Sequence, residues 1–206
     1  KMGAPEDLVI GIETPSLETT NELMRQCDLV LATGGGAMVH AAYSSGSPAL
    51  GVGVGNAVIT VDDTADLDAA AEKIRLSKTL DLAASCSSDN SVVLLDGIYE
   101  PMLEKLKAQG GYLCNEEEKA ALRNTLWDEE LHLNTAIVAQ PPEKIAQMAG
   151  LSIPEETKFF IVPEDGWGPE HPFSGEKLSV IMALYRARDI DHAIELTQNI
   201  QAYQGQ

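Results

Sequence analysis

Apolar runs alternate along the chain with segments of helical periodicity. The runs 28–33, 57–61 and 91–96 are rich in Val, Ile and Leu and predict buried strands. From Leu67, apolar residues recur at i, i+3, i+4 and i+7, which predicts an amphipathic helix over 67–80. Further strands are predicted over 49–54, 158–163 and 178–185, and further helices over 17–26, 37–45, 99–109, 116–127, 142–149 and 189–203. Strands joined by crossover helices form parallel sheets, so the predicted fold class is α/β.

Turn and cap residues support these boundaries. Ser16 occupies the N-cap position of the helix at 17–26, and glycines at 110 and 111 stop the helix at 99–109. The Pro- and Gly-rich stretch 163–175 is long for a connection, and connections of that length are often functional.

Composition and charge exclude several classes of protein. The chain has 206 residues, 44% of them hydrophobic, and this is enough for a real core. A net charge of −18 repels phosphate backbones and anionic membranes, so nucleic acid and membranes are not expected partners. No apolar stretch approaches the length of a spanning helix, and residues 1–7 lack the apolar core of a signal peptide. The expected location is the cytoplasm.

Cysteine and histidine spacing indicates neither a disulfide framework nor a metal site. The three cysteines are odd in number and share no close spacing, and the four histidines show no pairing at helical distance. We therefore expect reduced thiols and no bound metal. His171 differs from the other histidines because its loop combines Gly, Pro and both charge signs, which is typical of loops that contain functional residues. From the sequence, a purely structural role for His171 is as well supported as a functional one.

A glycine turn follows the strand at 28–33. Glycines let a ligand approach the backbone, and a helix N-terminus offers free N–H groups to an anion, so a phosphate cradle fits this turn. The spacing matches neither G-x-G-x-x-G nor the P-loop, and from the pattern alone a plain tight turn is the more frequent outcome. The residues concerned are Thr33, Gly34, Gly35 and Gly36.

Cys86 lies in a run of small residues, 83–90, between a predicted helix and a predicted strand. Backbone N–H groups in such a loop can stabilise a thiolate and later an oxyanion, so Cys86 is a candidate nucleophile. Most free cysteines are instead buried and inert, and we expect this packing role for Cys27 and Cys114.

Several segments, in order, resemble one known family. They are ATGGGAMV at 32–39 with AAYSSG at 41–46, PALGVGVGN at 48–56, SKTLD at 77–81 leading to Cys86, and HPFSGEKLS at 171–179. As a set they resemble the CoA-acylating branch of the aldehyde dehydrogenase superfamily, including the aldehyde dehydrogenase half of bifunctional aldehyde-alcohol dehydrogenases. The resemblance runs from about residue 28 to the end of the chain.

The resemblance implies an aldehyde dehydrogenase-like fold with two domains. Residues 1–60 would be the C-terminal part of a Rossmann-like dinucleotide-binding domain, and residues 61–206 a catalytic, thiol-bearing domain truncated at its C-terminus. We therefore expect the chain to be a fragment of a longer protein that forms a homo-oligomer.

The resemblance also implies a mechanism. Cys86 would attack a small aldehyde, hydride would pass to NAD or NADP, and a thioester on Cys86 would result. The hydrolytic branch has a glutamate that activates water, but Gly51 occupies the matching position. Loss of such a base costs about 10²–10⁴-fold in water attack, which favours coenzyme A as the nucleophile. The expected product is an acyl-CoA.

Cofactor contacts and substrate follow from the same resemblance. The family binds its cofactor through residues that match Thr33, Gly34, Gly35, Gly36, Gly51, Phe173 and Glu176. The residues 172–179 and 200–205 are most similar to those of sulfoacetaldehyde dehydrogenases. Arg75, Lys78 and Lys177 are candidate cations for a sulfonate, although a solvated charge is the more frequent role of such residues. Acetaldehyde or succinate semialdehyde as the substrate, or a non-catalytic nucleotide-binding module, are the alternatives.

Overall fold

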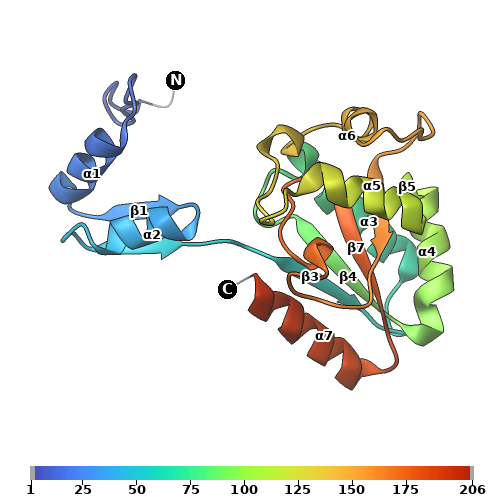
Figure 1. The fold of residues 1–206 in the computed structure, drawn as a ribbon. Helices are drawn as coiled ribbons and strands as arrows, with labels where there is room; N and C mark the ends of the chain where they lie inside the picture. Colours follow the sequence, from blue (N-terminus) through green and yellow to red (C-terminus); the bar gives the residue numbers. More distant parts are fainter. Residues whose placement is uncertain (1–2, 205–206) are drawn as a thin grey trace. The chain divides into compact units, whose positions relative to one another are not determined.

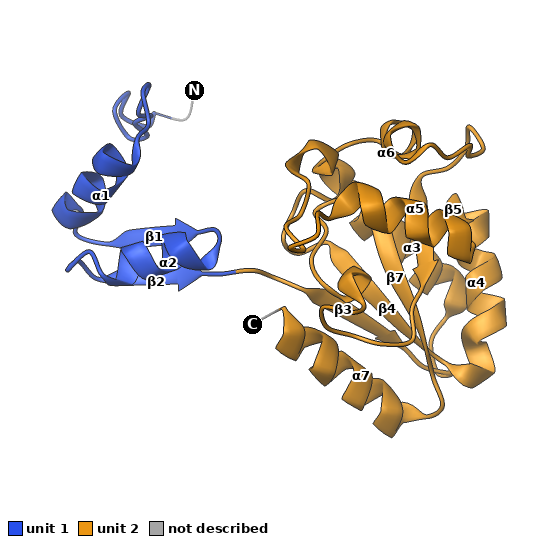
Figure 2. Cartoon of the chain, viewed as in Figure 1, with its two compact units in different colours: residues 1–53 blue, residues 54–206 orange. Residues whose placement is uncertain are grey.

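The structure, a computed structural model, describes residues 3–204 and contains two compact units. They divide between Gly53 and Val54 (Figure 2). The expected domain boundary at residue 60 would cut through β3 (Ala57–Val61), which lies entirely in the larger unit. The roles of the two domains stay predictions.

The smaller unit is a short α/β segment. It contains α1 (Leu17–Gln26), β1 (Val30–Thr33), α2 (Gly36–Tyr43) and β2 (Ala49–Val52). The two strands pair in parallel, with Val30 opposite Ala49 and Thr33 opposite Val52. Its buried hydrophobic residues are Met24, Val30, Ala32 and Ala42.

The larger unit is built on a parallel five-stranded sheet in the order β3-β4-β7-β6-β5 (Figure 1). The remaining strands are β4 (Asp89–Leu95), β5 (Gly111–Leu113), β6 (Phe159–Pro163) and β7 (Ile181–Ala187). The helices are α3 (Leu67–Thr79), α4 (Tyr99–Ala108), α5 (Glu116–Leu126), α6 (Pro142–Ala149) and α7 (Ile190–Tyr203). The α/β class and the parallel sheet are confirmed.

The central strands are buried along nearly their whole length. β4, β6 and β7 carry apolar runs without alternation, as expected when helices cover both faces of a parallel sheet. α7 packs against β3, β4 and β7, while α3 packs against β4 and β6 and also contacts α4. The sheet and these helices bury one continuous core. Among the helices of residues 3–204, none combines the length and apolar character needed to cross a membrane.

Parallel strands bring the segments that precede them to one edge of the sheet. Gly55 precedes β3, Cys86 precedes β4, and Glu176 precedes β7. Because β4 lies between β3 and β7, these three segments are neighbours at the amino edge. Between α3 and Cys86 the backbone takes positive φ values at three successive residues that are not glycine: Asp81 (50°), Leu82 (53°) and Ala83 (59°). Such a run is strained for L-residues, and it lies directly before the cysteine loop.

Candidate active site

Cys86 is exposed in the loop between α3 and β4. The loop is closed by short local bonds: the Ser88 N–H donates to the Ser85 carbonyl at 3.0 Å, and the Ser85 and Ser87 hydroxyl oxygens are 2.9 Å apart. Small side chains therefore surround the thiol without covering it. This geometry leaves the sulfur accessible to a substrate.

Gly55 lies directly against the backbone of this loop. A Cβ at position 55 would be 2.8 Å from the Cys86 carbonyl oxygen and 3.6 Å from the Cys86 Cβ. Because real Cβ atoms do not approach a backbone oxygen so closely, any side chain at position 55 would displace the loop. The absence of a side chain at Gly55 therefore helps to set the position of the thiol.

The other two cysteines occupy packing positions. Cys114 is buried, and burial raises the pKa of its thiol to about 12. Cys27 is half-buried at the C-cap of α1 and packs against the small cluster of Met24, Val30, Ala32 and Ala42. A thiol with a raised pKa is a poor nucleophile at neutral pH, so Cys114 is not a competitor of Cys86.

Hydrogen bonds fix the segment before β7 against the rest of the amino edge. The Asn56 side-chain amide donates to the Ser174 carbonyl at 2.8 Å. The Glu176 N–H donates to Gln204 Oε1 at 3.1 Å, and the Lys177 N–H donates to Asn90 Oδ1 at 3.2 Å. The backbone around Glu176 is therefore held from β4, from the start of β3 and from the end of α7.

Two lysines are fully buried at this edge. Lys177 Nζ donates to the carbonyls of Phe173 and Gly175, at 2.6 and 2.7 Å. Lys78 Nζ has no hydrogen-bond partner within residues 3–204, and burial lowers the pKa of Lys78 to about 7. The expectation that Lys78 and Lys177 are solvated charges is wrong, because both side chains are buried. Arg75 remains partly exposed and donates to Gln109 Oε1 at 2.9 Å.

The two predicted cofactor residues of the segment 171–179 have different surroundings. Phe173 is fully buried, with its ring edge-on to Trp127 at a centroid distance of 4.9 Å. Glu176 is partly buried, and desolvation raises the pKa of its carboxyl group while Lys177 and Lys78 oppose that rise. One carboxylate oxygen, Oε1, has no partner among the described residues. The Glu176 side chain therefore has a polar atom without a hydrogen-bond partner, whereas the Phe173 side chain only packs.

The predicted glycine turn joins β1 to α2 within the smaller unit. The Gly34 N–H donates to the Val52 carbonyl at 3.1 Å, and Gly35 is the N-cap of α2 without a side-chain cap. The first N–H groups of a helix have no partner inside it, and around both Gly35 and Gly36 a Cβ would meet no atom within 4 Å. Thr33 ends β1 directly before the turn. The turn therefore offers open space and free N–H groups, which fit a phosphate group.

Gly51 has a packing reason to be glycine. A Cβ there would be 2.7 Å from Val39 Cγ1 and 2.8 Å from the Tyr43 ring. The Gly51 N–H also donates to the Tyr43 hydroxyl at 3.0 Å. α2 thus packs directly onto β2 at this position, and a carboxylate side chain has no room there.

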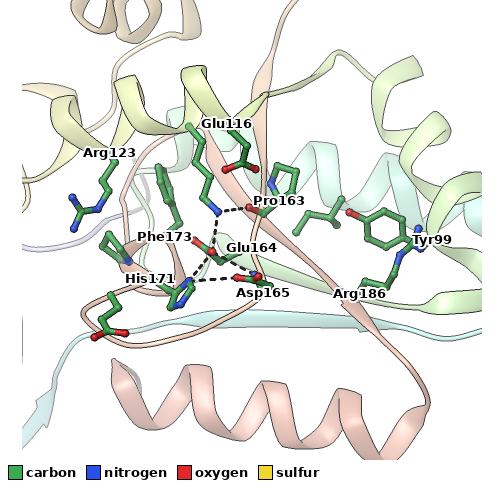
Figure 3. Close-up of a pocket in the computed structure, with 13 residues that line it drawn as sticks. Tyr99, Glu116, Arg123, Pro163, Glu164, Asp165, His171, Phe173 and Arg186 are labelled. Carbon is green, nitrogen blue, oxygen red and sulfur yellow. Dashed lines mark hydrogen bonds and ion pairs between the residues drawn. The ribbon is translucent and has the colours of Figure 1, made fainter.

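His171 lies at the opposite, carboxyl edge of the sheet, in a pocket of about 390 Å³. Glu164, which directly follows β6, is buried there, with Lys119 Nζ and His171 Nδ1 each 2.9 Å from its Oε1 (Figure 3). Side-chain atoms of Glu164, Asp165 and His171 that could ligate a metal ion lie within 4.8 Å of one another. The spacing of these residues along the sequence does not predict the cluster, because only the folded loop brings the three side chains together. Lys119 already neutralises Glu164, which gives the cluster a loop-anchoring role.

Lys78 and Gly55 are the residues of the amino edge that sequence reasoning did not place correctly. Lys78 follows Ala71 and Ile74 at helical spacing, and both of these are buried. That spacing alone puts Lys78 on the apolar face of α3 and was the available signal. For Gly55 no local signal exists, because the contact with Cys86 is made between segments distant in sequence.

Comparison with known proteins supports the resemblance along nearly the whole chain. The sulfoacetaldehyde dehydrogenase (acylating) of Cupriavidus necator is 45% identical over 208 residues, which cover 100% of this chain and 42% of that protein. The bifunctional aldehyde-alcohol dehydrogenase AdhE of Escherichia coli is 44% identical over 98% of this chain and 23% of its own length. A succinate-semialdehyde dehydrogenase (acetylating) of Clostridium kluyveri is 34% identical over 100% of this chain and 45% of its own length. The chain thus spans less than half the length of these relatives. No family model matches the sequence.

Solved structures show the same fold. An acetylating aldehyde dehydrogenase from Geobacillus thermoglucosidasius superposes with a TM-score of 0.94 at 40% identity, over 98% of this chain and 45% of that one. A Rhodopseudomonas palustris propionaldehyde dehydrogenase with bound CoA and an acylated cysteine gives 0.87 at 29% identity, over 96% and 45%. An engineered glycolyl-CoA reductase with bound NADP+ gives 0.88 at 28% identity, over 97% and 46%.

The fold is that of the acylating aldehyde dehydrogenases, a class of oxidoreductases. The resemblance to the CoA-acylating branch is thus confirmed in sequence and in fold. The sulfoacetaldehyde dehydrogenases, to which the motifs pointed, are among the relatives found, at 45% identity for the Cupriavidus necator enzyme.

Proposed function

We propose that the protein carrying this chain oxidises a small aldehyde to its acyl-CoA, with NAD or NADP as the electron acceptor and Cys86 as the nucleophile. The observation that carries this proposal is the exposed Cys86 thiol, held at the amino edge of the sheet by a loop that contacts Gly55. A non-catalytic module would instead be expected to bury this cysteine. The acylated cysteine of the Rhodopseudomonas palustris enzyme gives independent support.

The proposed reaction has two stages, formation of a thioester on Cys86 and transfer of the acyl group to coenzyme A. Cys86 Sγ, as the thiolate, forms a bond to the aldehyde carbon, and the aldehyde oxygen takes the negative charge near the backbone N–H groups of the loop. The bound oxidised cofactor supplies the acceptor for the hydride that leaves this carbon. The carbonyl double bond then re-forms as a thioester on Cys86. The thiolate of coenzyme A attacks that thioester, and Cys86 leaves again as a thiolate.

Transfer to coenzyme A rather than to water is favoured by Gly51. By the resemblance, this position corresponds to the glutamate that activates water in hydrolytic enzymes. Val39 and Tyr43 exclude any side chain there. Without a carboxylate base at this position, a thiolate is the better nucleophile toward a thioester.

The glycine turn supports a dinucleotide cofactor. The open space above Gly35 and Gly36 and the free N–H groups at the start of α2 suit a pyrophosphate. Thr33, Gly34, Gly35 and Gly36 would hold that group. By the resemblance, Phe173 and Glu176 belong to the segment that contacts the cofactor on its nicotinamide side in the family. Gly51 would let β2 and α2 pack closely beneath the cofactor.

For the substrate we propose sulfoacetaldehyde, supported by the 45% identity to the Cupriavidus necator enzyme. The buried lysines of this chain do not supply a surface cation for a sulfonate, so the substrate proposal rests on sequence similarity. Acetaldehyde and succinate semialdehyde are the alternatives, because proteins named for aldehyde-alcohol and succinate-semialdehyde oxidation are also similar. A cytoplasmic location and a homo-oligomeric assembly complete the proposal.

The test is formation of acyl-CoA by the protein that carries this chain. With sulfoacetaldehyde, NAD or NADP, and coenzyme A, we expect cofactor reduction that depends on both the aldehyde and coenzyme A. Cys86→Ser should lower the rate by at least about 10³-fold, whereas Cys27→Ser, at a packing position, should retain it. Equal rates for Cys86→Ser and the wild type would overturn the assignment, and faster turnover of acetaldehyde would redirect the substrate.

A further inference from the structure

Asn56 is a buried polar residue that joins three separate segments at the amino edge of the sheet. Its side-chain Nδ2 donates to the Ser174 carbonyl at 2.8 Å and to the Ile200 carbonyl at 3.3 Å. Ser174 ends the short helical turn 172–174, and Ile200 is fully buried near the C-terminal end of α7. Asn56 thus fastens the segment before β3 to a helix that packs on the sheet.

The Asn56 side chain is retained in the interior at an energetic cost. Both of its partners are carbonyls, which can only accept, so the amide nitrogen faces them. The amide oxygen, Oδ1, is buried and has no hydrogen-bond partner within residues 3–204. An unpaired buried acceptor is unfavourable, and it calls for an explanation beyond packing. The two bonds made by Nδ2 supply one, because they join segments that lie 118 and 144 residues further along the chain.

The chain just before β3 has little regular structure of its own to fix it. Residues 53–56 belong to no helix or strand. The ladder between β3 and β4 is also irregular at its start, since the register shifts between Ala57 and Val58. Regular strand pairing therefore begins only at Val58. The side-chain bonds of Asn56 anchor the chain directly next to Gly55.

Gly55 passes this anchor on to the thiol loop. A Cβ at position 55 would be 2.8 Å from the Cys86 carbonyl oxygen, so the two backbones are in direct contact. On its other side the loop follows the run of positive φ values at 81–83. Strained backbone of this kind persists only where surrounding contacts hold it in place. Loss of the support at Gly55 would let the loop relax and would move the sulfur.

We propose that Asn56 is a positioning residue for Cys86: its two hydrogen bonds hold Gly55 against the thiol loop and thereby fix the sulfur in its reactive position. The inference rests on the proposed function, because the position of this thiol matters only if Cys86 is the nucleophile. All of the residues involved belong to the larger unit. The role of Asn56 is therefore independent of how the two units are placed.

The test is acylation of Cys86 by acetyl-CoA or sulfoacetyl-CoA without a dinucleotide, in the protein that carries this chain. The Cys86 thiolate forms a bond to the acyl carbon while the bond to the coenzyme A sulfur breaks, so no oxidant or reductant is needed. Asn56→Ala should lower the maximal rate of acylation about 10- to 100-fold. The acyl-CoA concentration that gives half of this rate should change little, because Asn56 is buried. Asn56→Asp, of equal size but without a donor as a carboxylate, should be impaired at least as much.

Asn134→Ala is the matched control. Asn134 Nδ2 also donates to a backbone carbonyl, that of Thr125 at 3.0 Å, but it joins α5 to the short helical turn 135–137. Its loss should lower stability without slowing the acylation of Cys86. The buried Cys114 reports on folding in every variant, because its thiol reacts with iodoacetamide only when the larger unit opens.

A measurement on the wild type covers the case in which the Asn56 variants do not fold. In NMR spectra of protein with labelled asparagine, acylation of Cys86 should shift the side-chain amide signals of Asn56 and leave those of Asn134 unchanged. Wild-type acylation rates in folded Asn56→Ala and Asn56→Asp, or unmoved Asn56 signals, would overturn the inference while leaving the proposed function standing. No acylation of Cys86 in the wild type by either acyl-CoA would instead refute the proposed function.

Discussion

At the scale of single residues, the sequence singles out the proposed nucleophile but not the residues around it. The small-residue run and the family motifs identify Cys86, and the structure exposes it. The contact of Gly55 with the Cys86 backbone and the burial of Lys78 arise from packing between distant segments. Local patterns do not contain such contacts. The residues around the proposed nucleophile could therefore be identified only from the fold.

Lys78 should reduce the stability of the larger unit. Its folded pKa of about 7 lies below the unfolded value of about 10.4. Between these values the unfolded chain binds more protons, so stability rises with pH from about 7 toward 10 and is lowest below 7. Lys78→Met removes this penalty and should stabilise the fold by roughly 1–4 kcal/mol at pH 6, with a smaller gain at pH 10.

Urea unfolding followed by the fluorescence of Trp127 and Trp167, both in the larger unit, measures this effect. Lys73→Met, at an exposed position of α3, is the matched control and should change stability little at either pH. A Lys78→Met protein that is less stable than the wild type at pH 6 would contradict the account of the buried ammonium.

Gly55→Ala should impair catalysis more than folding. The new Cβ would press on the Cys86 carbonyl oxygen and move the loop, and a displacement of this kind costs about 10- to 100-fold in rate. Steady-state kinetics and a melting curve separate the two effects. Gly97→Ala, where a Cβ meets nothing within 4 Å, serves as the control. Full activity in Gly55→Ala would show that the loop tolerates the displacement.

At the scale of elements, periodicity located most helices and strands to within a few residues. The bounds of α1, β3 and α6 match the predicted ranges 17–26, 57–61 and 142–149. β7 begins at Ile181, three residues after the predicted start at 178, because Leu178 has a positive φ of 45° and its carbonyl accepts from the Ala139 N–H outside the sheet. The short edge strand β5 was missed, since three residues, the first of them a glycine, leave no period to detect.

Asn115 should stabilise α5 measurably. Its side chain accepts from the Glu118 N–H, while the Glu118 side chain accepts from the Asn115 N–H, and together they form a capping box. Asn115→Ala removes half of that arrangement and should cost about 1 kcal/mol. Chemical denaturation gives the value. Asn124→Ala, exposed on the same helix, should cause no loss, and an equal loss in both variants would argue against the cap.

At the scale of the whole molecule, the chain contains one substantial core and one small one. The α/β class follows from alternating strand and helix patterns, but the order β3-β4-β7-β6-β5 does not, because the pairing of distant strands has no local signature. The larger unit buries a continuous cluster that includes residues of β3, β4, β6 and β7, and partly buried residues of β5 pack against it. Within residues 3–53, the smaller unit buries four hydrophobic side chains, Met24, Val30, Ala32 and Ala42.

This difference predicts that the two units behave differently when separated. Residues 54–206 expressed alone should unfold cooperatively, because their core is complete. Residues 1–53 alone should lack a cooperative transition, since so small a core rarely offsets chain entropy. Circular dichroism during thermal melting tests both. Cooperative unfolding of 1–53 would show that its few core residues suffice.

The most direct test of the central claim is acylation of Cys86 by an acyl-CoA. The thioester step is reversible and involves no hydride, so acetyl-CoA or sulfoacetyl-CoA should acylate the thiol in the absence of any dinucleotide. Mass spectrometry of peptides should find the acyl group on Cys86, labile to hydroxylamine, with Cys27 and the buried Cys114 unmodified. An unmodified Cys86, or equal labelling of Cys86 and Cys27, would contradict the account.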